Sequence, residues 1–350
     1  MEIPSIFLNR ILVEAAKKRA VNLHLTVGSS PVMRIDGQLA YMENEGMLTS
    51  EIIEKIIDSF STEEERQKLN HDREITLAKT LAGSFRYKIN VFYQKDLPSI
   101  TFRNIQGVIK NLNDLKLPKF ILELSKKNSG LFIVSGNQSS GKTSTIASII
   151  EEINRNYGKR IIALENPIEY LFISKKSIIE QRQIGRDVIS YAEGLKYCLN
   201  EDANVVYVGE MAEDLKDVIP TIFELASGNA LVIMEMNAEN SERVLERIVA
   251  SLKKTMSDEA ARYLLSDVLR GILVQKLLPK IGGGVVLAYE MMIMNGPIMA
   301  LIRESKIYQI ENIINTSRKE GMISMEKCVE ELVKNGEVKS EDNVYNLTNS

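Results

Sequence analysis

The chain has 350 residues, of which 44% are hydrophobic and 26% charged, and its net charge is −3. This length suits two domains of ordinary size, and the composition is typical of a soluble globular protein. The near balance of charge gives no general attraction to nucleic acid, so we expect no nucleic-acid partner. Two cysteines, Cys198 and Cys328, are too few for a disulfide framework or a four-thiolate zinc site.

The N-terminal residues, Met1–Arg10, lack the basic region and apolar core of a signal peptide. The apolar runs of the chain are far shorter than the roughly 20 residues that a membrane-spanning helix needs. We therefore expect no transmembrane segment, and a protein that is cytoplasmic or peripheral at the inner face of the cytoplasmic membrane.

Residues 1–107 are predicted to form a small mixed α/β domain. Ser5–Arg19 has apolar residues at helical spacing, and Asp36–Gly37 is a dipeptide that favours a hairpin turn between two short strands. Phe85–Val91 alternates apolar with polar or cationic residues, which predicts a half-buried strand with a cationic outer face. Ile100–Arg103 has the same alternation and is its predicted partner.

Residues 108–119 are predicted to be a linker, and residues 120–290 the core of a second domain. That core contains four continuous apolar runs, typical of parallel strands buried on both faces, at Leu131–Val134, Ile161–Leu164, Val205–Val208 and Ala230–Met234. Ser144–Asn156 supplies a crossover helix, and Asp258–Leu278 is predicted to be a single amphipathic helix. Residues 291–350 are predicted to be a helical C-terminal region. The predicted class is therefore α/β.

A phosphate-binding motif lies in the middle of the chain. Gly136–Thr143 reads GNQSSGKT and matches the P-loop pattern GxxxxGK[ST] at every fixed position, between an apolar strand and a helix. The glycines let backbone N–H groups face the phosphates, and the helix N-terminus adds partial positive charge. Lys142 is placed to reach the β- and γ-phosphates of ATP, and Thr143 to ligate Mg²⁺. The predicted binding residues are Gly136, Asn137, Gln138, Ser139, Ser140, Gly141, Lys142, Thr143 and Ser144.

Three acidic residues follow buried strands and are predicted to act at the same site. Glu210 ends the run after Val205–Val208, where P-loop enzymes place an acid near Mg²⁺ or the attacking water. Glu165 and Glu169 follow the preceding apolar run, and ligands of α/β sheets bind beyond the carboxyl ends of the strands. If the chain had no P-loop, the simpler interpretation of these three acids would be that they are ordinary carboxylates on the protein surface.

The order of motifs resembles one family. The P-loop, ENPIEY at Glu165–Tyr170, EQRQIGRD at Glu180–Asp187 and VGEM at Val208–Met211 are similar to the secretion ATPases of type IV pili and type II secretion. The likeness is greatest to the pilus retraction (PilT) type. Segments outside the motor also resemble it, namely Asn22–Leu25, Pro31–Gly37, Ser266–Arg270 and Gln275–Leu278.

The resemblance implies a PAS-like N-terminal domain, a RecA-like P-loop ATPase domain and a ring-shaped hexamer that binds ATP and Mg²⁺. It implies that Glu210 is the general base or positions the attacking water, and that Glu165 and Glu169 are the acidic box. Arg86 and Arg103 match N-terminal arginines that reach toward the nucleotide, although a solvated strand face is the simpler interpretation of these residues alone. The partners that it implies are the other subunits of a homo-hexamer or of a mixed ring with a paralogue, and an inner-membrane platform protein.

Several residues depart from the family pattern. The family's histidine should fall within Ile233–Glu239, yet either Met236 or Asn237 stands there, and neither titrates near neutral pH. The acidic box has Asn166 in place of aspartate, and lysine stands at Lys88 where an arginine is usual. Three further arginine positions hold Lys196, Asn200 and Ala212.

A retraction motif near the C-terminus is also changed, because Pro297–Leu301 has Met299 and Ala300 in place of arginine and asparagine. These two replacements would either pack in the core or change a partner surface, and we favour packing. Two functions follow from the whole pattern. The first is a slow hexameric motor ATPase of pilus retraction or related secretion, and the second is a nucleotide-binding regulatory subunit that hydrolyses little ATP.

Overall fold

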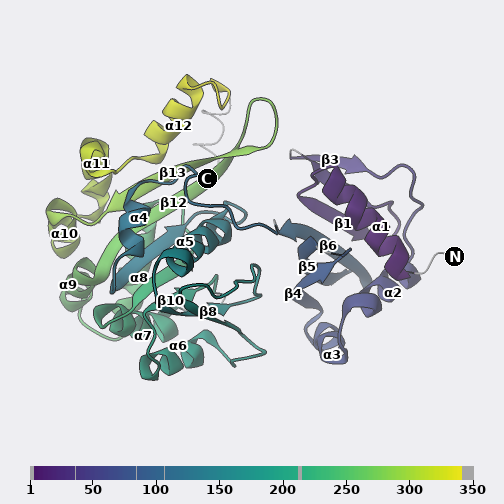
Figure 1. The fold of residues 1–350 in the computed structure, drawn as a ribbon, viewed down its shortest axis with the longest axis horizontal. Coiled ribbons are helices and arrows are strands. Elements are labelled where there is room, and N and C mark those ends of the chain that lie inside the picture. The colour runs from purple at the N-terminus through teal and green to yellow at the C-terminus, as the bar shows by residue number, and fades with distance from the viewer. Residues whose placement is uncertain (1–3, 36, 84, 106, 212–214, 341–350) are drawn as a thin grey trace. The chain divides into compact units, whose positions relative to one another are not determined.

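The computed structural model describes residues 4–35, 37–83, 85–105, 107–211 and 215–340 (Figure 1). The chain divides into two compact units, Met1–Val108 and Ile109–Ser350. Within the described ranges, no helix combines the length and the apolar character needed to cross a bilayer.

The described residues of the first unit form a six-stranded antiparallel sheet with three helices. Its strand order is β3-β2-β1-β6-β5-β4. The strands are β1 (Asn22–Thr26), β2 (Val32–Ile35), β3 (Gln38–Tyr41), β4 (Glu74–Leu81), β5 (Phe85–Gln94) and β6 (Leu97–Ile105). The helices are α1 (Pro4–Lys17), α2 (Ser50–Phe60) and α3 (Glu63–Asp72).

Buried and more exposed side chains alternate along β5, so one face of this sheet is apolar and can pack against helices. Ile89 of β5 lies opposite Phe102 of β6, and both side chains are fully buried, which confirms the predicted strand pair. Their apolar face packs with α1 and α2 in one core that includes Ile11 and Ile56. The predicted hairpin also forms, since β2 and β3 pair antiparallel, although Asp36 of its turn lies outside the described residues.

The second unit contains a seven-stranded sheet in the order β13-β12-β7-β11-β10-β8-β9, in which only β13 runs antiparallel to its neighbour. The strands are β7 (Gly130–Ser135), β8 (Arg160–Glu165), β9 (Ile178–Gln183), β10 (Val205–Val208), β11 (Leu231–Met236), β12 (Leu269–Pro279) and β13 (Val285–Ile293). Every residue of β7, β10 and β11 is buried, so both faces of the sheet centre are covered. The predicted parallel sheet and the α/β class are confirmed.

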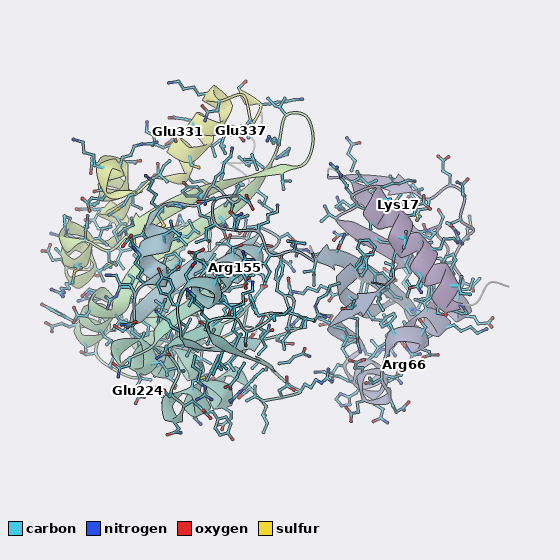
Figure 2. All side chains as sticks on the ribbon, viewed as in Figure 1. Lys17, Arg66, Arg155, Glu224, Glu331 and Glu337 are labelled. Atoms are coloured by element: carbon cyan, nitrogen blue, oxygen red, sulfur yellow. The ribbon has the colours of Figure 1, made fainter. Side chains whose placement is uncertain are left out.

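Helices connect the parallel strands and pack on the sheet (Figure 1). The connecting helices are α5 (Lys142–Asn156), α6 (Tyr191–Asn200), α7 (Leu215–Ser227), α8 (Ser241–Leu252) and α9 (Asp258–Val268), and a further short helix, α4 (Phe120–Ser125), precedes β7. Helix α5 follows the interior strand β7 and ends near Arg155, which is labelled in Figure 2. Arg155 forms an ion pair with Glu151 of the same helix at 2.6 Å.

The prediction of one helix over Asp258–Leu278 is wrong. Helix α9 ends at Val268, and β12 begins at Leu269. Most residues of β12 are buried, because β12 lies between β7 and β13 and exchanges hydrogen bonds with both. A short apolar run that is buried on both faces has no periodicity that separates strand from helix, so pairing within the sheet decides its conformation.

The C-terminal part contains α10 (Gly296–Arg303), α11 (Ile310–Thr316) and α12 (Met325–Lys334), and residues 341–350 lie outside the described part. Short 3₁₀ turns occur at Ile307–Gln309 and Arg318–Glu320. On α10, Ile298 and Ile302 face the core, Met299 is half-buried, and Ala300 is exposed. The expectation that both replaced residues of this motif pack in the core is therefore wrong for Ala300.

Candidate nucleotide-binding site

The candidate site lies at the carboxyl ends of four neighbouring parallel strands. The P-loop follows β7, Glu165 ends β8, Glu210 follows β10, and Asn237 follows β11. Because parallel strands end at the same edge of a sheet, the topology collects these residues into one region. The predicted acids and the P-loop are thus brought together by the sheet.

The P-loop requires its glycines. Gly136 has a φ of +137°, and a Cβ atom on it would lie 2.3 Å from the carbonyl oxygen of Gln275 on β12. Gly141 is the N-cap of α5 with a φ of +91°, in the region that L-residues rarely adopt. The two glycines therefore allow the chain to form the tight turn of the P-loop between β7 and the N-terminus of α5.

Lys142 and Ser140 have the environment expected for phosphate binding. Lys142 is 4% exposed, and its Nζ donates hydrogen bonds to the carbonyl oxygens of Gly136 and Asn137 at 3.0 and 3.1 Å. The Oγ atom of Ser140 is buried and has no hydrogen-bond partner in the part of the chain that the structure describes. A buried polar atom without a partner is costly, and a phosphate oxygen would satisfy it. The residues present therefore fit a nucleotide phosphate.

Other predicted P-loop residues face solvent or a neighbouring loop. Asn137, Gln138 and Ser139 are exposed. The hydroxyl of Ser144 lies 2.7 Å from the hydroxyl of Tyr170, in the loop that carries the acidic box. Ser144 thus connects the phosphate loop to this loop.

Further contacts fasten the acidic-box loop to α5. Asn154 donates a hydrogen bond to the carbonyl oxygen of Ile173 at 2.9 Å, and Lys175 forms an ion pair with Glu151. Together with the Tyr170 contact, these bonds hold the segment after β8 along the length of α5.

Glu165 is more deeply buried than an acid that binds a cation usually is, and its pKa is raised. Its side chain is 3% exposed, and burial raises the pKa of its carboxyl group to about 8. Gln181 donates to Glu165 Oε1 at 2.9 Å, which opposes that rise, while the charges of Glu235 and Glu169 add to it. A carboxyl group with this pKa is largely protonated near neutral pH, so it donates a hydrogen bond more readily than it attracts a cation.

Glu210 is held by the residue that follows β11. The Nδ2 atom of Asn237 donates to Glu210 Oε1 at 2.5 Å, and the carbonyl oxygen of Glu210 accepts from the Tyr191 hydroxyl at 3.1 Å. Met236 is buried at the end of β11. Of the two residues that could replace the family's histidine, Asn237 is the one that faces the acid.

A fourth acid was missed by the sequence analysis. Glu235 of β11 is 3% exposed and accepts a hydrogen bond from the Tyr207 hydroxyl at 2.7 Å. Burial raises the pKa of Glu235 to about 6, against hydrogen bonds from Tyr207 and Thr143 and the charge of Lys142. The available signal was a single acid within a strand that is otherwise apolar, directly after the run Ala230–Met234.

The remaining predicted residues lie on other elements of the chain. Arg86 and Arg103 lie on β5 and β6 of the first unit, where both are half-buried, and their predicted approach to the nucleotide stays a prediction. Lys196 and Asn200 are exposed on α6, where Lys196 pairs with Glu193 at 2.8 Å. Ala212 lies outside the described residues.

Comparison with known proteins gives consistent matches. The profile of the family described as Type II/IV secretion system protein matches residues 2–284. The type IV pilus retraction ATPase PilT of Pseudomonas aeruginosa is 29% identical over 335 residues, which are 96% of this chain and 96% of PilT. The type IV pilus ATPase PilU of the same organism is 27% identical over 336 residues, covering 96% of this chain and 86% of PilU.

Solved structures have the same fold. A crystal structure of the pilus retraction motor PilT with bound ADP superposes with a TM-score of 0.83, at 35% identity over 96% of each chain. The Legionella pneumophila ATPase DotB also superposes with a TM-score of 0.83, over 99% of this chain and 96% of DotB, and at 18% identity this likeness concerns the fold alone.

Proposed function

The chain belongs to the type II/IV secretion system protein family, and from that premise we propose that it is an ATP-driven motor of pilus retraction or of a related secretion machine. The observation that carries the proposal is the P-loop, with buried Lys142 and the unsatisfied hydroxyl of Ser140 at the start of α5. The predicted resemblance to the PilT type is confirmed by relatives that match nearly the whole chain.

We propose roles for the residues that would contact the nucleotide, the metal and the attacking water. Lys142 and the backbone N–H groups of the loop would bind the phosphates, and the hydroxyl of Thr143 would ligate Mg²⁺. Bound Mg²⁺ would supply charge stabilisation to the phosphate oxygens. Glu210, held by Asn237, would orient the water that attacks the terminal phosphate.

A second function is favoured by the same hydrogen bond. An asparagine at position 237 cannot exchange a proton near neutral pH, and Lys196 and Asn200 stand where the family has arginines. Arginines that contact developing phosphate charge contribute on the order of 10³–10⁵ to turnover in P-loop enzymes. The alternative is therefore a nucleotide-binding regulatory subunit that hydrolyses little or no ATP.

We further propose that the protein assembles as a homo-hexamer, or as a mixed ring with a paralogue, at the cytoplasmic face of a membrane platform protein. The match to the secretion-protein family and the pilus ATPases PilT and PilU among the relatives support this proposal. Native mass measurement with and without ATP tests it, and a monomer under both conditions contradicts it.

Turnover separates the two functions. Steady-state phosphate release is measured for the wild type, Lys142→Ala and Glu210→Gln, and nucleotide binding is measured with a fluorescent ATP analogue. A motor gives wild-type turnover that both substitutions abolish. Binding without turnover above these variants supports the regulatory function, and wild-type protein that binds no nucleotide contradicts both.

A further inference from the structure

The segment that carries Asn237 leaves the sheet beside the start of the P-loop. Strand β11 pairs in parallel with β7 up to the last residue of each strand, Met236 and Ser135. Directly after Ser135, Gly136 turns the chain into the P-loop with a φ of +137°. The backbone pairing of the two strands therefore ends immediately before Asn237.

The hydroxyl of Ser135 continues the attachment beyond this point. It donates a hydrogen bond to the carbonyl oxygen of Ala238 at 2.9 Å, and its oxygen accepts one from the backbone N–H of Ala238 at 3.0 Å. Ser135 is fully buried and Ala238 is 8% exposed. Because buried backbone groups require hydrogen-bond partners, this one hydroxyl fixes both polar groups of Ala238 against the P-loop strand.

Asn237 is consequently held on both sides along the chain. Met236 before it is paired in the sheet, and Ala238 after it is bonded to Ser135. The carbonyl oxygen of Asn237 also accepts a hydrogen bond from Arg247 of α8. Its side chain is exposed and donates to Glu210 Oε1 at 2.5 Å. The backbone anchors thus determine where the amide meets the acid.

We infer that Ser135 is a positioning residue for ATP hydrolysis, which holds Asn237 against Glu210 at a fixed place relative to the phosphate loop. The inference rests on the proposed motor function, in which Glu210 orients the attacking water. A small displacement of a group that orients a reactant lowers the rate of the chemical step. Since Ser135 acts through Asn237, its loss should lower kcat and leave nucleotide affinity unchanged.

Three full-length variants and one control test this role. Ser135→Ala removes the hydroxyl, Asn237→Ala removes the amide that meets Glu210, and the double variant removes both. Ser125→Ala is the matched control, because Ser125 is also fully buried and its hydroxyl donates to a backbone carbonyl oxygen, that of Ile121 in α4, at 2.9 Å. Thermal unfolding establishes that each variant is folded.

The readouts are kcat for phosphate release and the dissociation constant of a fluorescent ATP analogue. We expect each single substitution to lower kcat about tenfold, the size of losing one hydrogen bond to a charged group. The double variant should also lose about tenfold, whereas independent effects would multiply to about a hundredfold. Analogue affinity should stay within about twofold of the wild type, and Ser125→Ala should keep the wild-type kcat.

If Ser135→Ala does not fold, Ser135→Cys replaces it in the same measurements. The thiol fills the site but forms weaker hydrogen bonds, so it must also lower kcat, with no further loss when combined with Asn237→Ala.

Several outcomes overturn the inference. An unchanged kcat in either single variant, or multiplied losses in the double variant, refutes the action of Ser135 through Asn237 and leaves the proposed motor intact. Weakened analogue binding by the Ser135 variant would show that the hydroxyl supports the phosphate loop instead. Wild-type turnover no higher than that of Lys142→Ala refutes the motor itself, and the role of Ser135 with it.

Discussion

Replacing Glu165 with glutamine should change how the stability of the second unit depends on pH. The folded state raises the pKa of this carboxyl group from 4.5 to about 8, chiefly by burial. The folded state therefore binds the proton more tightly than the unfolded state does. The favourable contribution is fully present below pH 4.5 and is lost as the pH rises through about 8.

The size of the effect follows from this difference in pKa. At about 1.4 kcal/mol per pH unit, the change from 4.5 to about 8 corresponds to a loss of about 5 kcal/mol when the group is fully ionised. Between about pH 5.5 and about pH 8, the wild type should lose about 3 kcal/mol through Glu165 alone. Glutamine, which stays neutral, should remove this loss while keeping a side chain of the same shape.

Chemical unfolding at both pH values, followed by circular dichroism, measures the effect. Glu224→Gln is the matched control, since this acid is exposed on α7 and does not contribute to the raised pKa of Glu165. We expect the Glu165→Gln and wild-type midpoints to diverge as the pH rises, and the control to follow the wild type. Parallel pH profiles for Glu165→Gln and the wild type would refute the raised pKa and the protonated state inferred from it.

Three further predictions concern the site and the core. Gly136→Ala should abolish binding of an ATP analogue, because the added methyl group would meet a backbone oxygen of β12 at 2.3 Å, and retained affinity would contradict this close approach. Asn237→His places an ionisable group where the side chain contacts Glu210, so phosphate release should rise at least several-fold, and an unchanged rate would contradict a catalytic role for this contact. Ile162→Ala, at a fully buried position, should lower the free energy of unfolding by about 2–5 kcal/mol, whereas Ile173→Ala, which is 78% exposed, should change it by less than about 0.5 kcal/mol in the same urea titration.

Local patterns in the sequence determined much of the architecture. The P-loop was identifiable because its chemistry requires glycine, lysine and threonine at fixed spacing between a strand and a helix. The parallel strands were identifiable from continuous apolar runs, and β5 and β6 from alternation, because burial on two faces or one leaves a different period. The P-loop and these strands could be predicted because each is defined by residues that are close together in the sequence.

Contacts between distant residues decided the rest. Residues after Val268 could extend α9 or form a strand, and pairing of β12 with β7 and β13 selected the strand. The choice between Met236 and Asn237 depended on which side chain meets Glu210, and this is set by the adjacency of β10 and β11. The carboxylate of Glu235 accepts a hydrogen bond from Tyr207 only because β11 lies beside β10 in the sheet. The sequence alone determines the phosphate loop and the strand patterns, whereas tertiary structure determines which acids face that loop, because strand order is not encoded in local periodicity.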